Sequence, residues 1–146
     1  MLYKELKKQA IKDLSDYYYL KSSLVTLQKE ISIMQNNPVY NSPAFGVAVM
    51  STSSADSALT RHISRIEYLE KILQNNTEKL QTIDLALKSL RPAQREILSS
   101  YYINRQRKAV YRLAIDTHTD RSALYRRAAR ALDKYILAYF GTLGEK

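Results

Sequence analysis

The chain has 146 residues, which is the length of one domain or of one domain with an arm. It has no Cys, three scattered Gly and two distant His (His62 and His118), so we expect no metal site, no cofactor, no phosphate-binding loop and no enzyme activity. The 23 Lys and Arg outnumber the 14 Asp and Glu, and the formal charge of +9 favours an acidic partner, most often nucleic acid.

The first predicted element is a helix over residues 2–35. Its apolar residues are spaced 4, 3, 4 and 3 positions apart, as in a helix packed along its length on another, and they are Leu20, Leu24, Leu27, Ile31 and Met34. Asn36-Asn37-Pro38 ends the helix. Charged residues are spread through the first fourteen positions, so we expect no signal peptide and a cytoplasmic location.

A long loop over residues 36–56 follows. It contains Pro38, Pro43 and Gly46. It overlaps the longest uncharged segment, residues 31–55, which these residues prevent from spanning a membrane as a helix. A loop of this length is either disordered or used for contact. Its apolar patch, Phe45 and residues 47–50, either packs back on the helices, which we favour, or binds a partner.

The next predicted helix begins near Ser57. One row of apolar residues repeats every seven positions (Leu59, Ile66, Leu73, Leu80 and Leu87), and a companion row contains Leu69, Ile83 and Leu90. His62 and Asn76 also fall in the companion row. Each either fixes the register of the packed helices or faces solvent, and for His62 we favour solvent. Residues 1–90 are thus expected to form an antiparallel helical hairpin that joins copies of the chain.

Residues 91–139 differ from the rest in charge. They carry 11 basic and 4 acidic residues, and nine of the basic residues are Arg. Residues 1–90 carry 11 basic and 9 acidic residues, and nine of the basic residues there are Lys. Because Arg can contact phosphate and guanine through two parallel hydrogen bonds, the second part is expected to bind nucleic acid. The alternative is a solvated basic surface without a ligand.

Three helices are predicted in residues 91–141. The first starts at Pro92, ends near Asn104, and buries Ile97, Leu98, Tyr101 and Tyr102. The second covers residues 106–115, with Val110, Leu113 and Ala114 inward. After a turn at residues 116–119, Asp120 caps the third helix, which covers residues 121–139 and is closed by Gly141.

The third helix has two different faces. The inward face is predicted to contain Leu124, Ala128, Ala131, Leu132, Tyr135 and Ile136. The outward face has the composition of a helix that reads a DNA major groove, where Arg126 can contact guanine, Ser122 a base of either type, and Tyr125 a thymine methyl or a phosphate. The alternative is an arginine-rich surface helix. The DNA-binding residues predicted here and on the preceding helix are Arg121, Ser122, Tyr125, Arg126, Arg127, Arg130, Arg107, Lys108 and Arg112.

Residues 87–135 resemble the helix-turn-helix of region 4 of bacterial sigma factors, and more closely the ArpU/RinA-type phage regulators of late transcription. The resemblance is carried by Leu90 to Pro92, the Leu113-Ala114 pair, the segment from Asp120 to Arg126, and Ala131-Leu132. The sequence departs from that pattern at Thr117, where an apolar residue is usual, and at His118, where Gly is usual. A non-Gly residue with positive φ costs about 1 kcal/mol, so the turn is expected to differ in shape.

This resemblance implies an all-α transcriptional regulator in the cytoplasm of a bacterial host cell. It would bind double-stranded DNA, and its hairpin would either join copies of the chain or contact RNA polymerase. Two alternatives remain: a DNA-packaging protein of small-terminase type, in which helical hairpins build rings, and a helical interaction protein that binds an acidic protein partner. Catalysis would depend on the carboxylates of Asp13, Asp16, Glu67 and Glu70, which we interpret instead as solvated helix charges.

Overall fold

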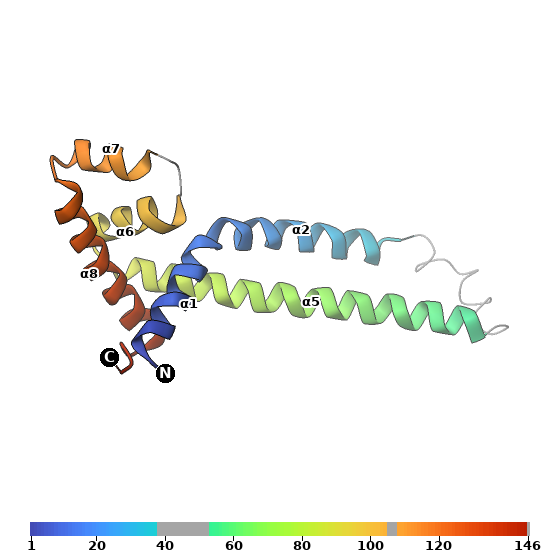
Figure 1. The fold of residues 1–146 in the computed structure, drawn as a ribbon. Helices are drawn as coiled ribbons and strands as arrows, with labels where there is room; N and C mark the ends of the chain where they lie inside the picture. The colour runs from blue at the N-terminus through green and yellow to red at the C-terminus, as the bar shows by residue number, and fades with distance from the viewer. Residues whose placement is uncertain (38–52, 105–107, 146) are drawn as a thin grey trace. The chain divides into compact units, whose positions relative to one another are not determined.

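The computed structural model describes residues 1–37, 53–104 and 108–145 (Figure 1). These residues form helices without any strand, and the one β-type contact among them is an isolated bridge between Leu2 and Glu145. The all-α prediction is confirmed. None of the helices in the described ranges is both long and apolar enough to cross a membrane. The chain divides into two compact units, residues 20–78 and residues 1–19 with 79–146.

The unit of residues 20–78 consists of two helices that run in opposite directions, α2 (Tyr17–Gln35) and α5 (Ser53–Lys88) (Figure 1). Its buried cluster contains Ile31 of α2 and Ile66 and Leu69 of α5, with Leu27, Met34 and Leu73 packed against them. These residues come from the repeats predicted in the sequence. Helix α5 begins at Ser53, four residues before the predicted start. The apolar patch at 45 and 47–50 lies outside the described residues.

Polar residues also join α2 to α5. Asn76 Nδ2 donates to Ser23 Oγ at 3.1 Å. Asn76 therefore faces the neighbouring helix rather than solvent. His62 Nε2 donates to the Met34 carbonyl at 3.0 Å. The prediction that His62 faces solvent is therefore wrong. The carbonyls in the last turn of α2 lack partners within their own helix, so they accept hydrogen bonds from side chains outside it, such as that of His62.

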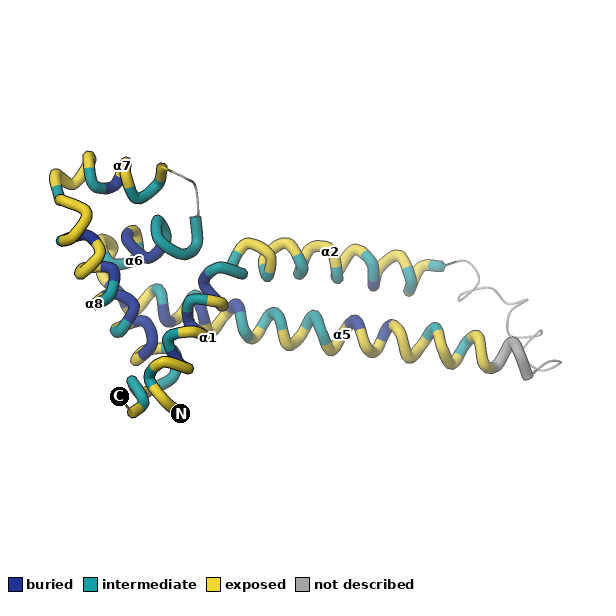
Figure 2. Tube along the Cα trace, viewed as in Figure 1, coloured by how far each residue is buried: buried dark blue, intermediate teal, exposed yellow. Residues whose placement is uncertain are grey.

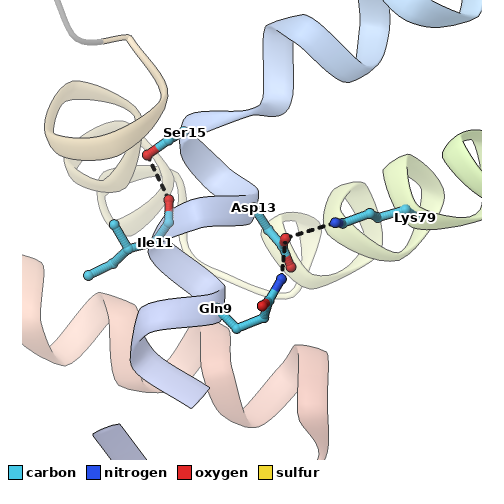
Figure 3. A network of polar contacts seen from close by, with 5 residues as sticks. All are labelled: Gln9, Ile11, Asp13, Ser15 and Lys79. Atoms are coloured by element: carbon cyan, nitrogen blue, oxygen red, sulfur yellow. Dashed lines mark hydrogen bonds and ion pairs between the residues drawn. The ribbon is translucent and has the colours of Figure 1, made fainter. Parts of the chain in front are cut away.

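The prediction of a single helix over residues 2–35 is also wrong. The segment forms two helices, α1 (Tyr3–Ser15) and α2, which are separated at Asp16. Ser15 Oγ donates to the Ile11 carbonyl at 2.7 Å, a back-bond that is common where helices bend or end (Figure 3). Helix α1 buries Leu6, Ala10 and Leu14 and packs on the C-terminal helices, so it belongs to the other compact unit.

Asp13 of α1 is buried, with 1% of its surface exposed, rather than solvated as predicted. Its Oδ1 lies 3.0 Å from Lys79 Nζ and accepts a hydrogen bond from Gln9 Nε2 at 2.8 Å (Figure 3). A buried carboxylate requires such partners, because an isolated buried charge is very costly. The prediction failed because the sequence does not show that Lys79, 66 positions away, provides the compensating charge. By contrast, Glu67 and Glu70 are exposed.

The C-terminal helices are α6 (Pro92–Leu98), the π-helix η1 (Ser99–Ile103), α7 (Ala109–Asp116) and α8 (Arg121–Phe140). Helix α8 packs on α6, α1 and α7, and its buried side lines the core of this unit (Figure 2). The start at Pro92 and the end before Asn104 match the sequence prediction. The compact unit is larger than the predicted 91–141 domain because α1 and residues 79–88 of α5 are part of it.

Candidate nucleic-acid interface

Helix α8 begins and ends at the residues that the sequence indicated. The Asp120 side chain accepts a hydrogen bond from the Ala123 amide at 2.7 Å, which satisfies one of the free amides of the first turn. Gly141 has a φ of 78° and donates its amide to the Leu137 carbonyl at 2.9 Å, so it closes the helix in a left-handed conformation. These two local signals fix the length and the start of the basic helix.

The division of α8 into two faces is also confirmed. Its buried residues are the six that were predicted: Leu124, Ala128, Ala131, Leu132, Tyr135 and Ile136. The predicted site residues of α8 are all exposed, and together they are called the basic face: Arg121, Ser122, Tyr125, Arg126, Arg127 and Arg130. Tyr125 has 63% of its surface exposed, and it lines one shallow hollow with Arg121, Ser122 and Arg126. One continuous surface therefore combines guanidinium, hydroxyl and aromatic groups.

Helix α7 adds basic groups. Arg112 and Lys108 are both exposed, and Lys108 stands at the residue before the first turn, where its carbonyl accepts the Arg112 amide at 2.9 Å. Leu113 is buried, and Val110 and Ala114 are half-buried, which places the inward side of α7 as predicted. The other predicted basic residue of this segment, Arg107, lies outside the described residues.

The turn between α7 and α8 covers residues 117–120. Thr117 Oγ1 donates to the Leu113 carbonyl at 2.6 Å, and the Thr119 amide donates to the Ala114 carbonyl at 3.0 Å. His118 is exposed and has a φ of 52°, a left-handed conformation that Gly adopts most easily. The backbone at His118 is therefore strained, and the hydrogen bonds of Thr117 and Thr119 lie on either side of it.

The basic face has no acidic partners within the described residues. The two ion pairs there are Arg65–Glu30 and Lys79–Asp13, and neither involves α7 or α8. Arg127 Nη1 donates only to the hydroxyl of Thr119, at 3.4 Å. Charges that are not compensated inside the protein remain available for phosphates, and Arg is well suited to bind them.

Comparison with known proteins finds no matching family model, curated protein or solved structure. The assignment of this surface therefore depends on the chain's own geometry and chemistry. Across the described ranges no group of His, Cys, Asp and Glu has the arrangement of a metal site.

The sequence prediction placed Tyr101 and Tyr102 in the core and so did not recognise them as neighbours of the basic face. Both are only half-buried. Burial raises the pKa of both hydroxyls, and the nearby Tyr125 raises it further. For Tyr101, the positive charge of Arg121 acts in the opposite direction and lowers the pKa. The two rings lie on the π-helix η1, whose wider turn changes the direction of each side chain from that of an α-helix. No residue pattern in the sequence indicated this change of helix type.

Proposed function

We propose that this chain is a double-stranded DNA-binding transcriptional regulator of phage or prophage type, in which α7, the turn and α8 form a helix-turn-helix. One observation carries the proposal: the exposed Arg121 and Arg126 line one hollow with Ser122 and Tyr125, and neither arginine has an acidic partner among the described residues. In such modules the second helix enters the major groove and presents its first turns to the bases.

The positions of the side chains suggest a division of roles. Ser122, Tyr125 and Arg126 lie on the first two turns of α8, where they would contact base edges. Arg130 lies one turn further along the helix, Arg112 lies on α7 and Lys108 directly precedes α7; at these positions phosphates would be nearer. Phosphate contacts would position the module, and base contacts would select the site.

The antiparallel pair formed by α2 and α5 would hold copies of the chain together or contact RNA polymerase. Two helices bury little apolar surface by themselves, and large apolar side chains remain exposed on this pair, including Val25 at 67%, Ile33 at 61% and Tyr68 at 62%. One helix-turn-helix reads only a few base pairs, so a second copy would supply the missing specificity.

The test is selection of binding sites from random double-stranded DNA by the purified full-length chain, followed by anisotropy titrations at several salt concentrations. With about five phosphate contacts we expect the log–log salt slope to be near −4 to −5. Arg126→Gln combined with Arg130→Gln should abolish site-specific binding. Lys29→Gln combined with Lys71→Gln removes the same charge from exposed positions outside the proposed interface and should retain it.

The outcomes separate the proposal from its alternatives. Enrichment of a defined sequence, bound by dimers or small oligomers, supports a regulator. A ring of many subunits on packaging-site DNA would replace it with a packaging protein. If the chain does not bind DNA even at low salt, DNA is not its partner, and an acidic protein partner is favoured.

A further inference from the structure

A hollow of about 320 Å³ lies between α6, α7 and α8, beside the basic face. Its floor is apolar and is formed by Ile97, Leu113 and Leu124, one from each helix. The hollow lies wholly within one compact unit, so its shape is set by packed helices. Its size and its apolar floor are those of a site for a small organic ligand.

The rim of this hollow is strongly basic. Three arginines, Arg91, Arg127 and Arg130, line it together with a single acidic residue, Glu96. None of these groups forms an ion pair in the described part of the chain. Three unpaired positive charges around an apolar floor match a molecule that has an apolar body and a negatively charged end.

We propose that the hollow binds a small amphipathic anion, an aliphatic or aromatic carboxylate or sulfonate, with its apolar body on the floor and its charged group between the rim arginines. Burial of the apolar body provides affinity, and the arginine hydrogen bonds to the anionic oxygens provide orientation. A phosphate of DNA alone does not fit this description, because it has no apolar part for the floor formed by Ile97, Leu113 and Leu124.

Occupation of the hollow would oppose DNA binding, an inference that rests on the proposed function. Arg127 and Arg130 belong both to the rim and to the basic face of α8. An anion that engages them neutralises two groups that would otherwise contact phosphates. The coupling must be reciprocal, so DNA would weaken the anion's binding by the same factor that the anion weakens DNA binding.

The experiment uses 8-anilinonaphthalene-1-sulfonate as a fluorescent probe and N-phenyl-1-naphthylamine, which has the same aromatic body without the sulfonate. The full-length chain should bind the sulfonate at one saturable site and the uncharged compound about ten-fold more weakly or not at all. Octanoate should displace the sulfonate. Loss of the charge preference, or displacement by an acidic amphipathic peptide and not by octanoate, would overturn the proposal.

Two variants test whether the probe binds in the hollow. Ala93→Leu fills it from an exposed position of α6, and Arg91→Gln removes one rim charge. Each should weaken sulfonate binding at least five-fold, whereas Lys88→Gln, which removes an exposed charge that does not line the hollow, should not. Unchanged binding by both Ala93→Leu and Arg91→Gln would mean that the probe binds elsewhere, which would overturn the proposal.

DNA competition is measured separately. Saturating octanoate should weaken binding of the selected DNA about ten-fold for the wild type and leave binding by Ala93→Leu unchanged. If octanoate binds in the hollow without affecting DNA affinity, the coupling is wrong and the ligand site stands. If the chain binds no DNA but still binds the sulfonate in a way that depends on Ala93 and Arg91, the proposed function fails and the ligand site again stands.

Discussion

Lys79 Nζ lies 3.0 Å from Oδ1 of Asp13, and the two members of this ion pair differ greatly in exposure. The Asp13 side chain is 1% exposed and the Lys79 side chain is 36% exposed. The pair joins α1 to α5 within the compact unit that also contains α8. The lysine can return to water when its partner is removed, whereas the carboxylate cannot.

We therefore expect the two single substitutions to have unequal effects on the free energy of unfolding. Lys79→Met leaves a buried carboxylate without its compensating charge and should cost about 3 kcal/mol, whereas Asp13→Asn should cost about 1–2 kcal/mol. Urea denaturation followed by circular dichroism measures both. Lys71→Met, at an exposed position of the same helix, is the control and should change stability by less than about 0.5 kcal/mol. Equal costs for the two partners would contradict the asymmetry.

A second prediction concerns alkaline pH. Tyr3 donates its hydroxyl proton to Asp133 Oδ1 at 2.5 Å, and this hydrogen bond, with burial, raises the pKa of Tyr3 to about 12. Because the pKa of Tyr3 in the folded state lies above its unfolded value of 10.0, the stabilisation is complete below pH 10 and is lost as the pH rises to 12. Tyr3→Phe should therefore cost about 1–2 kcal/mol at pH 8 and much less at pH 12.

Urea denaturation at pH 8, 10, 11 and 12 tests this prediction as the difference between wild type and Tyr3→Phe. Contributions of the other tyrosines are common to both proteins and cancel. Tyr19→Phe, at a position with 77% exposure, should leave the difference near zero at every pH. A cost for Tyr3→Phe that stayed constant up to pH 12 would show that the Asp133 contact does not stabilise the fold.

A third prediction compares two isoleucines of α5 in the unit of residues 20–78. Ile66 is buried in the cluster with Ile31 and Leu69, whereas Ile63 is 38% exposed. Ile66→Asp places an unpaired charge in this cluster and should cost more than about 3 kcal/mol, with a loss of helicity visible by circular dichroism. Ile63→Asp should retain helicity. If the helix pair joins copies of the chain through its exposed apolar residues, Ile63→Asp should still lower the sedimentation coefficient.

The turn before α8 gives a fourth prediction. His118 has a φ of 52°, which a β-branched residue adopts at the greatest cost. We expect His118→Gly to change the free energy of unfolding by less than about 1 kcal/mol, because relief of strain is opposed by the greater entropy of the unfolded chain. His118→Val should lower it by about 1–2 kcal/mol. Thermal denaturation of both variants measures this, and equal stability would show that the left-handed conformation is not retained in solution.

The parts of the fold that were predictable from the sequence depend on local signals. The start and end of α8 follow from Asp120 and Gly141, each of which acts on amides or carbonyls within a few residues. The buried face of α8 follows from its helical period. These signals also placed the candidate DNA-binding residues of α8, because the exposed face is what remains once the buried face is known.

The parts that were not predictable depend on residues far apart in the chain. Burial of Asp13 requires Lys79, and the contact of His62 requires the end of α2. The helix is interrupted at Asp16, and the part before it, α1, packs on the C-terminal helices. The apolar pattern continues through the interruption and does not reveal it. The hollow between α6, α7 and α8 is likewise formed by side chains of three separate helices.

The final prediction separates base reading from general attraction to DNA. Arg126 and Arg130 are both exposed, one helical turn apart on α8. A bidentate contact between Arg126 and guanine is worth about 1–3 kcal/mol of discrimination. Arg126→Ala should therefore weaken binding to the selected site much more than binding to random DNA. Arg130→Ala should weaken both about equally and flatten the salt slope by about one phosphate contact.

The measurement is a set of affinities for both variants, on selected and on random DNA, at two salt concentrations. The two variants are matched controls for each other, because each removes one guanidinium group from an exposed position of the same helix. Equal losses on both DNAs for Arg126→Ala would reduce Arg126 to a phosphate contact. A reversal, in which only Arg130→Ala relaxed specificity, would mean that α8 enters the groove by its middle turns rather than its first two, because the base edges would then lie nearer to Arg130.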